Sequence, residues 1–519
     1  EIENKKDSIF VNGLVSSGKK IFEMDEFKPI FSNLLNNIDI RKIEFSSKNN
    51  FSFNLNKKLK FNNLEVDTVI DLNQLILNEK NLKLKSYFPN FVNEIKLENH
   101  KIVINYSKNK FDIKGSGNIL LEDVLDNLSY QIIEDDNNLS FDSKINLKNN
   151  SLSIDFLDYK KEKNRSSLVS IKGKIKKNNK IRFDSISLKE KDNEILIKGL
   201  DLSENFKIID IQNLNINYKN NKKNLNKLNL YKKDSNFILE GESFDATRII
   251  AKIIDADKIS SSIFHNLNSK IKIKIKKTYI DDVNYINNLN GNINFNNNKI
   301  DVLKLESTFP NEKKINLSIK TNSLSETITK LSTSYPKPLI KRYNFIKGFE
   351  EGYLDFYSSK KNGKSNSMLI IDNFKIKEVP VFAKLLSLAS LQGMADLLTG
   401  EGIRFTDFEM NFSNKNGLMT IEEMYAIGPA VSIIMDGYIE TKKLVSLRGT
   451  LVPATTINRT IASIPVLGKI LVGGKTGEGV FGVSFKIKGA PKDLKTTVNP
   501  VKTLTPRFIT RTLEKIKKN

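Results

Sequence analysis

A Gly-Lys-Thr triplet, Gly474-Lys475-Thr476, follows an apolar run and is the stretch most similar to a nucleotide site. A phosphate-binding loop requires Gly, four residues and then Gly-Lys-Ser/Thr, because the intervening amides curl around one phosphate. Gly468 is one residue too far from Gly474, and the chain from Val480 onward alternates like a strand, where a phosphate site needs a helix. We therefore predict no nucleotide binding. The glycines that we interpret as a hinge between a helix and this strand are Gly473, Gly474, Gly477 and Gly479.

Other residues that commonly perform chemistry are scarce. Cys is absent, which excludes disulfides, thiolate metal sites and a Cys nucleophile. The two histidines, His100 and His265, are isolated, and we interpret both as surface or rim residues rather than metal ligands. The common hydrolase, metalloprotease and dinucleotide-binding motifs are also absent. The sequence thus predicts a protein that is not an enzyme and that uses no metal or cofactor.

The formal net charge of +23 invites a nucleic-acid partner, but the type of basic residue argues against it. Lys is scattered singly among Asn and Ile, whereas Arg, which contacts phosphate and guanine with two hydrogen bonds, is scarce. We predict no nucleic-acid binding, although a basic chain still favours anionic surfaces such as lipid headgroups. The most apolar window, 379–398, contains Lys384, Gln392 and Asp396, so no transmembrane helix is predicted.

Most of the chain alternates between apolar and polar residues in short runs separated by Asn, Gly, Asp and Lys. This period of two predicts many antiparallel strands joined by tight turns. In the clearest run, 270–277, Ile side chains lie on one face and Lys side chains on the other. The candidate residues for the lining of an apolar groove, with an ordinary core as the alternative, are Ile271, Ile273, Ile275, Ile315, Leu317, Ile319, Val483, Phe485 and Ile487.

Helical patterns are few and widely spaced. A helical insertion is predicted near 243–268, and amphipathic helices are predicted at 380–398, 453–471 and 503–517. We interpret the helix at 380–398 as a cap on the end of a groove or a membrane contact. The last helix suits a contact with an anionic membrane surface or a protein, or forms a solvated charged end of the chain. The apolar residues assigned to these contacts are Phe382, Leu385, Leu386, Leu388, Leu391, Phe508, Leu513 and Ile516.

Roughly 25 to 30 strands at a spacing of about 4.8 Å would make a sheet on the order of 120 to 145 Å long, which must twist. The apolar face of such a sheet needs a covering. A second sheet would give a closed, dry sandwich, and a bound ligand would fill an open groove. The alternation alone does not distinguish these arrangements, although a sandwich is the more common one.

From Asp372 the composition shifts from Asn and Lys toward Gly, Ala, Pro and Leu. The motifs in this part are Gly400-Glu401-Gly402-Ile403 before a strand, Gly449 to Pro453 before a helix, Ile464-Pro465-Val466-Leu467-Gly468, and Val498-Asn499-Pro500. Their order over Asp372 to Pro500 resembles the C-terminal region of the AsmA-like family, in particular its YhdP-type branch. Upstream, "GESFDATRII" resembles the helical insertion of YhdP-like central regions.

The resemblance implies a bridge-like lipid transfer protein of the Gram-negative cell envelope. The expected fold is mainly β: a long, twisted antiparallel sheet folded into an elongated hydrophobic groove, with a few amphipathic helices and a helical C-terminal part. The implied domains are a repetitive groove region at 1–335 and an AsmA-like C-terminal region at 336–519. The resemblance favours the open groove over the sandwich.

The function that the resemblance implies is non-enzymatic transport of phospholipid between the inner and outer membranes, through the periplasm. The expected partners are phospholipid, the membrane and envelope proteins. The family's inner-membrane helix has no counterpart in this sequence and would lie upstream of Glu1, and the C-terminal end would lie near the outer membrane. The alternative is a structural or assembly factor for outer-membrane proteins that conducts no lipid.

Overall fold

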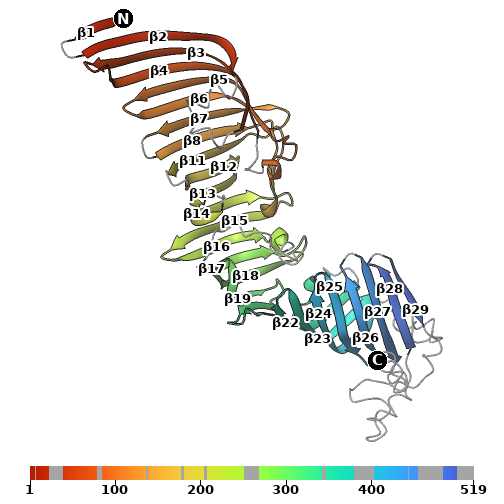
Figure 1. Cartoon of the computed structure of the whole chain (residues 1–519). Helices are drawn as coiled ribbons and strands as arrows, with labels where there is room; N and C mark the ends of the chain where they lie inside the picture. The colour runs from red at the N-terminus through yellow and green to blue at the C-terminus, as the bar shows by residue number, and fades with distance from the viewer. Residues whose placement is uncertain are drawn as a thin grey trace. The chain divides into compact units, whose positions relative to one another are not determined.

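The chain is mainly β and divides by its contacts into two compact units, Glu1–Val283 and Asn284–Asn519. Of the 27 strands of the main sheet, β1–β8 and β11–β17 (15 strands) belong to the first unit and β18–β29 (12 strands) to the second (Figure 1). The computed structural model describes residues 1–5, 8–22, 39–78, 84–135, 138–176, 180–203, 207–250, 268–341, 347–378, 402–429, 431–441, 443–453, 483–491 and 493–498.

The first unit is an antiparallel sheet in which strands that are consecutive in sequence are hydrogen-bonded neighbours, with two exceptions. Its strands are β1 (Ile2–Lys5), β2 (Ser8–Phe22), β3 (Asp39–Asn56), β4 (Phe61–Asn78), β5 (Glu94–Ser107), β6 (Lys110–Leu120), β7 (Leu125–Glu134), β8 (Asn138–Leu147), β11 (Ser167–Lys176), β12 (Ile181–Glu190), β13 (Asn193–Leu202), β14 (Ile208–Lys219), β15 (Leu225–Lys233), β16 (Asn236–Asp245) and β17 (Ser269–Tyr279).

The first exception is that β8 pairs with β11, because β9 (Leu152–Ile154) and β10 (Tyr159–Lys161) form a separate hairpin outside the main sheet. Two 3-10 turns, η1 (Leu84–Ser86) and η2 (Asp155–Leu157), belong to connections at the same end of the strands as this hairpin. The second exception is that β16 and β17 pair in parallel. A parallel pair requires a connection that carries the chain back from one end of the sheet to the other. The segment between β16 and β17, where the insertion near 243–268 is predicted, makes this connection.

In that insertion, β16 continues through Asp245 and a helix begins at 247–250, where the Ile250 amide donates to the Ala246 carbonyl at 2.9 Å. Residues 251–267 lie outside the described part of the chain. The predicted helices at 380–398, 453–471 and 503–517 fall almost entirely outside it as well, apart from Pro453, which ends β27.

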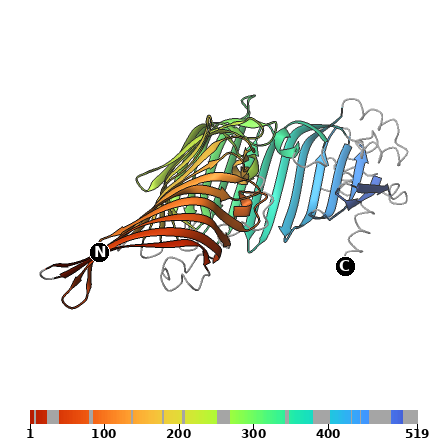
Figure 2. The same ribbon diagram turned by 90° about the horizontal axis from the view of Figure 1, so that it is seen from above.

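The second unit is an unbroken antiparallel meander in which every strand pairs with the next one in sequence. In Figure 2 its cyan and blue strands lie side by side in one layer. Its elements are β18 (Tyr285–Asn296), β19 (Lys299–Thr308), β20 (Lys314–Thr321), β21 (Thr327–Thr333), α3 (Lys337–Lys341), β22 (Lys347–Lys361), β23 (Lys364–Glu378), β24 (Ile403–Lys415), β25 (Leu418–Ile427), β26 (Val431–Glu440), β27 (Leu444–Pro453), β28 (Val483–Ala490) and β29 (Asp493–Val498).

The domain boundary that the family resemblance implies, after residue 335, falls inside this second unit, between β21 and α3. Asn and Gly form the tight turns of the meander. The β22–β23 and β24–β25 turns each place an Asn-Gly pair in the left-handed region, with φ of 50° and 76° at Asn362 and Gly363. Two consecutive positive φ angles make the turn type whose twist matches that of paired strands, and Asn-Gly is its preferred sequence.

The core of the second unit gathers toward the end of the sheet where β22, β24 and β26 begin. There, Phe374 stacks between Phe349 and Phe405, with ring centroids 5.2 Å apart on each side. Such aromatic pairs contribute about 0.5 to 1.5 kcal/mol each beyond burial. The buried residues of this core are Ile340, Phe349, Leu354, Ile371, Phe374, Ile403, Phe405, Ala426, Val431, Ile433, Leu451, Val483 and Phe485.

Glycines in both sheets lie under an aromatic ring of the neighbouring strand. A Cβ built on Gly115 would lie 2.4 Å from the ring of Tyr130, its partner in β7. A Cβ on Gly449 would lie 2.8 Å from the ring of Phe485, its partner in β28, and 2.5 Å from a main-chain oxygen. The rings thus occupy the space that a side chain would take.

We predict that Gly449→Ala lowers the stability of the second unit by about 1 to 3 kcal/mol, because overpacking forces neighbouring groups apart. The added methyl would lie 2.5 Å from the Ile434 carbonyl oxygen, which cannot move without disturbing β26. Calorimetric unfolding measures this effect. Gly18→Ala in β2 is the control, because nothing lies within 4 Å of its Cβ position. Equal unfolding temperatures for Gly449→Ala and the unmodified chain would contradict the close approach.

Candidate functional site

One face of the first unit carries a row of cross-strand partners that runs unbroken from β4 to β17. Residues in register on neighbouring strands point to the same face, so the row is a continuous feature of the surface. Nine of its twelve members are Ile or Leu, and the other three are Gly, Tyr and Ser. We call it the first apolar row: Ile70, Ile102, Gly115, Tyr130, Ser143, Ile171, Ile186, Ile197, Leu214, Leu230, Leu239 and Ile273.

The second unit carries an equivalent row with one member from each of its twelve strands, and none of the twelve is polar. We call it the second apolar row: Gly291, Leu305, Leu317, Leu331, Phe356, Leu369, Met410, Met424, Met435, Gly449, Phe485 and Val498. The opposite face of the same strands carries charged and amide side chains, such as Lys304 and Asn316.

Most side chains of both rows are only half-buried. Ile273 and Phe485 are the buried ones, at 7% and 4% exposed, whereas Ile102, Ile186 and Leu331 keep part of their surface open. Close contacts among the described elements run almost entirely between hydrogen-bonded neighbours, so each unit is a single sheet layer over this part of the chain. Among the described residues, these apolar sheet faces have no second layer of the kind that normally covers them.

The structure places all nine predicted lining residues on these apolar faces. Ile273 belongs to the first apolar row, and Leu317 and Phe485 belong to the second. The other six lie two residues before or after these three in the same strands, and therefore on the same faces. They are Ile271, Ile275, Ile315, Ile319, Val483 and Ile487. The sequence reasoning missed the members of the first row in β4 to β16, although the same alternation marks them.

The other predicted site residues lie outside the described part of the chain. The cap or membrane-contact residues are in the connection from β23 to β24 and in the C-terminal segment, and the hinge glycines are in the connection from β27 to β28. These residues are Phe382, Leu385, Leu386, Leu388, Leu391, Phe508, Leu513, Ile516, Gly473, Gly474, Gly477 and Gly479.

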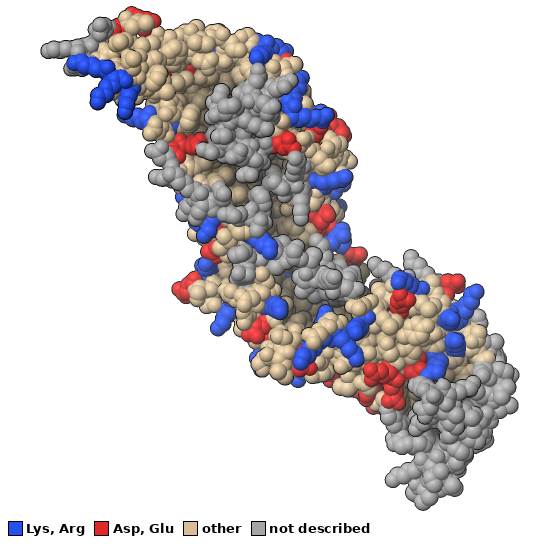
Figure 3. Space-filling model, viewed as in Figure 1, with Lys and Arg blue, Asp and Glu red and all other residues tan. Residues whose placement is uncertain are grey.

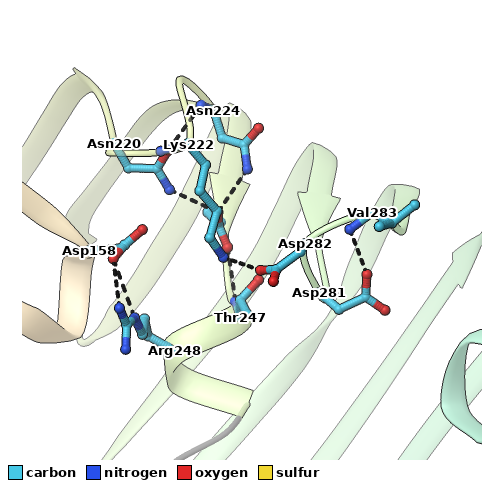
Figure 4. A network of polar contacts seen from close by, with 10 residues as sticks. Asp158, Asn220, Lys222, Asn224, Thr247, Arg248, Asp281, Asp282 and Val283 are labelled. Atoms are coloured by element: carbon cyan, nitrogen blue, oxygen red, sulfur yellow. Dashed lines mark hydrogen bonds and ion pairs between the residues drawn. The ribbon is translucent and has the colours of Figure 1, made fainter. Parts of the chain in front are cut away.

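A polar network fixes one end of the first unit, where the connections β14–β15 and β16–β17 meet η2 (Figure 4). Asp245, 4% exposed, accepts hydrogen bonds of 2.8 Å from the side chains of Asn220 and Asn224 and one of 3.1 Å from the Thr247 amide. Burial alone would raise the pKa of this carboxyl, but these donors outweigh it and hold the pKa below the usual value. Asp245 therefore stays ionised and fixes the start of the helical turn.

Two ion pairs extend this network along the same end of the sheet. Arg248 donates to the carboxylate of Asp158, at 3.1 Å from Nη2, and this bond ties the helical turn to the residue that follows η2. Lys222 pairs with Asp282, which raises the pKa of the lysine. The arrangement holds charges in fixed positions and contains no nucleophile beside a base, so we interpret it as a structural clamp.

A second buried polar group lies between the β9–β10 hairpin and the main sheet. Lys161 is fully buried and donates to the carbonyls of Lys148 and Asn150 at 3.0 and 2.5 Å. Burial lowers its pKa, an effect that nearby carboxylates, including Asp126, oppose. Tyr159 donates to Glu190 at 2.6 Å, and burial raises the pKa of the phenol. These bonds close the end of the apolar face with ordered connections.

The interpretation of His100 as a surface or rim residue was wrong. Its side chain is 1% exposed, lies against the Cβ position of Gly117, and contacts the Asn118 carbonyl through Nε2 at 2.8 Å. Burial lowers its pKa, so the ring is neutral and structural. His100 lies two residues before Ile102 and so shares its apolar face by simple alternation along β5, where its partner in β4 is the buried Leu72. His265 lies outside the described residues.

A cavity of about 700 Å³ opens on β18–β23 of the second unit. β23 lines it with Met368 and Ile370 and not with Leu369, which lies between them in the second apolar row. The cavity therefore opens on the polar face, and the lining also includes five members of the second apolar row, Gly291, Leu305, Leu317, Leu331 and Phe356. Its lining includes Lys304, Glu306, Asn316, Lys330, Asp355 and Tyr357. The sequence reasoning did not anticipate this cavity, because it follows from the twist of six strands.

Charges of both signs are interspersed over the described surface seen in Figure 3. Within the described ranges, no group of three or more His, Cys, Asp or Glu side chains has the geometry of a metal site. None of the helices described in the structure is long and apolar enough to span a membrane.

Searches against protein-family models, curated proteins and solved structures found no match to this chain.

Two carboxylates face each other directly on the polar face of the second unit. Asp372 in β23 is the register partner of Asp407 in β24, and burial together with repulsion from Asp407 and Asp355 raises the pKa of Asp372. Like charges at directly opposed positions destabilise a sheet. Because the folded state holds this proton more tightly than the unfolded state, the pair favours folding at low pH, and this benefit is lost as pH rises through the folded pKa.

We therefore predict that Asp372→Asn raises the thermal unfolding temperature at pH 7 and that the gain disappears near pH 3, where both proteins carry a neutral side chain. Unfolding curves at a series of pH values measure it. Asp71→Asn is the matched control, since Asp71 faces Lys101 in the same type of pair and its substitution should bring no gain. A gain that is independent of pH would sink the charge explanation.

Proposed function

We propose that the apolar faces of the two units hold the hydrocarbon tails of phospholipid, and that the protein transports phospholipid between membranes without covalent chemistry. The observation that carries the proposal is the pair of unbroken apolar rows, whose side chains are half-buried in a single sheet layer. Either a folded partner or a ligand must cover such a face, and an acyl chain suits it because it is long, narrow and apolar.

The dimensions of the rows support this proposal. Twelve strands at a spacing of about 4.8 Å give each row a length of roughly 53 Å, several times the length of one acyl chain. Exposing a tail to water costs about 0.8 kcal/mol per CH₂, so a lipid gains from moving along an unbroken row rather than through solvent. Aromatic rings of neighbouring strands lie over Gly115 and Gly449, so these two positions of the rows are covered by apolar groups.

The two long edges of the first unit differ in a way that suits an amphiphile. The clamp around Asp245 and the β9–β10 hairpin close one edge with buried hydrogen bonds. The opposite edge consists of short turns that carry exposed lysines, including Lys58, Lys60 and Lys108. A lipid with its tails on the apolar row would direct its phosphate toward these lysines and the surrounding water.

The resemblance to AsmA-like proteins in 372–500 supports a more specific form of the proposal. In this form the chain acts in the periplasm of a Gram-negative envelope and moves phospholipid between the inner and outer membranes. The inner-membrane end would lie on the N-terminal side and the C-terminal segment near the outer membrane. No nucleotide, nucleic acid or cofactor takes part in this mechanism.

Site-specific crosslinking in intact cells tests the proposal. A photoreactive residue at Ile102, half-buried in the first apolar row, should crosslink to phospholipid. The same residue at Val103, which is 36% exposed on the opposite face of β5, should not. The two positions are adjacent in one strand, so expression and local stability are closely matched. Mass spectrometry of the crosslinked product identifies the lipid.

Transport itself is tested by Ile102→Asp, which would place a charge in the path of the tails. We expect it to abolish transfer of a fluorescent phospholipid between donor and acceptor vesicles, whereas Val103→Asp should not. Absence of lipid crosslinks at Ile102, or equal crosslinking at both positions, would refute the proposal.

A second candidate function, assembly of outer-membrane proteins, is favoured by the open edge of β2. β1 pairs with β2 only over 8–11, and the last bond joins the Asn12 amide to the Glu1 carbonyl. Beyond it the edge has no strand partner among the described residues, and Leu14, Val15 and Ile21 are more than half exposed there. An unpaired strand edge can accept a strand from another chain.

Proline separates this candidate from lipid transport, because it cannot donate a backbone hydrogen bond to an added strand. Backbone amides point alternately to the two sides of a strand, so either Leu14→Pro or Val15→Pro blocks the open side without breaking the pairing of β2 with β3. The variant with an unchanged unfolding temperature is the informative one. Loss of outer-membrane protein assembly in that variant, with lipid transfer intact, would favour the second candidate. We expect both activities to be unchanged.

A further inference from the structure

The cavity on the polar face of the second unit is a built cleft that the lipid proposal does not use. Two cross-strand rows form its floor, one with Glu306, Asn316 and Asp355 and the other with Lys304, Lys330 and Tyr357. We propose that this cleft binds a neutral, hydroxyl-rich ligand, such as a segment of an oligosaccharide. This inference goes beyond the proposed function, because the polar side chains that carry it alternate with the second apolar row and are not members of it.

The polar groups of the cleft are available to a ligand. The side chains of Lys304, Glu306, Asn316 and Asp355 make no hydrogen bond or ion pair with any described residue. Some exposed charges elsewhere on the same unit are paired, as in Arg448 with Asp436 at 2.7 Å. Donors and acceptors therefore alternate over the cleft without satisfying one another, and a ligand whose hydroxyl groups both donate and accept complements such a surface.

The charge of the cleft selects against ionic ligands. Its two lysines, Lys304 and Lys330, are balanced by Glu306 and Asp355, so the lining has no net charge. A phosphate-bearing ligand or a nucleic acid would need an excess of basic groups, and a cationic ligand an excess of acidic ones. A neutral ligand meets no repulsion from either pair.

The position of the cleft argues against an extended peptide. Peptides that bind sheets as added strands use the backbone groups of an edge. Between β19 and β22 these groups are already bonded to neighbouring strands on both sides. Recognition here must use side chains, as in the binding of sugars.

Apolar groups at one end of the cleft supply surfaces for the faces of sugar rings. The Tyr357 ring is 37% exposed, and Lys330 Nζ lies 6.0 Å from its centroid. Met368 and Ile370 lie beside it on β23. With a volume of about 700 Å³ and a span of five strand spacings, roughly 24 Å, the cleft accommodates a chain of several sugar units rather than a single one.

Calorimetric titration of the full chain with the neutral oligosaccharides maltohexaose and chitohexaose tests the proposal. We expect saturable binding of at least one of them, weakened by at least about tenfold in Tyr357→Ala, a loss of roughly 1.4 kcal/mol. Tyr353→Ala is the matched control, because Tyr353 lies on the same face of the same strand, is 41% exposed, and is outside the cleft. It should bind as the unmodified chain does.

Asn316→Ala provides a second variant that removes a polar contact and leaves the aromatic ring in place, so the test survives a folding defect in Tyr357→Ala. Unfolding temperatures of all variants report such a defect. No saturable binding of either sugar, equal losses in Tyr357→Ala and Tyr353→Ala, or displacement of the sugar by an unfolded polypeptide would overturn the proposal. Lipid crosslinking at Ile102 reports on the apolar face of the first unit, whereas sugar binding reports on the cleft of the second, so failure of one proposal is distinguishable from failure of the other.

Discussion

Both units depend on the register between neighbouring strands. A slip of one residue would move every side chain of a strand to the opposite face, so an apolar row across twelve strands exists only if each pairing holds its register. Where the alternation of apolar and polar residues along a strand shifts by one residue, a β-bulge keeps the apolar side chains on the same face. Between β11 and β12, Ile171 faces Ile186 while Gly173 faces Phe183, and the extra residue in β12 keeps the Phe183 ring on the apolar face.

Strand register is also maintained by the connections at one edge of the first unit, because they hold the ends of the strands in place. In the first unit the closing elements are polar groups removed from water: Asp245 with its amide donors, Asp158 with Arg248, and Lys161 on two carbonyls. Buried hydrogen bonds of this kind are costly when broken singly, so they favour one arrangement of the connections. The turns described at the other edge, such as those from β3 to β4 and from β5 to β6, are short.

The two faces of the second unit offer different chemistry. The second apolar row presents aliphatic, Met and aromatic groups with no polar member. The cleft opposite it presents unpaired donors and acceptors around Tyr357. One sheet layer can carry both surfaces because alternate side chains point to opposite sides. The apolar row and the cleft are thus linked by a single backbone.

The sequence by itself determined that the protein is mainly β, and it identified which residues of single strands share a face. The alternation in 270–277 and at Ile315, Leu317 and Ile319 is a local pattern, and a strand of any sheet converts it into one apolar and one polar face. Helical patterns allowed no comparable check, because the predicted helices lie almost wholly outside the described residues.

Only the tertiary structure decided how these strands combine. The parallel pairing of β16 with β17, the burial of His100 beside Gly117, and the cleft floored by Glu306, Lys330 and Tyr357 join residues from separate strands. No local pattern encodes such contacts, because they follow from strand order, register and twist. Alternation is a property of one strand, whereas a row, a buried clamp or a cleft is a property of many strands held in register.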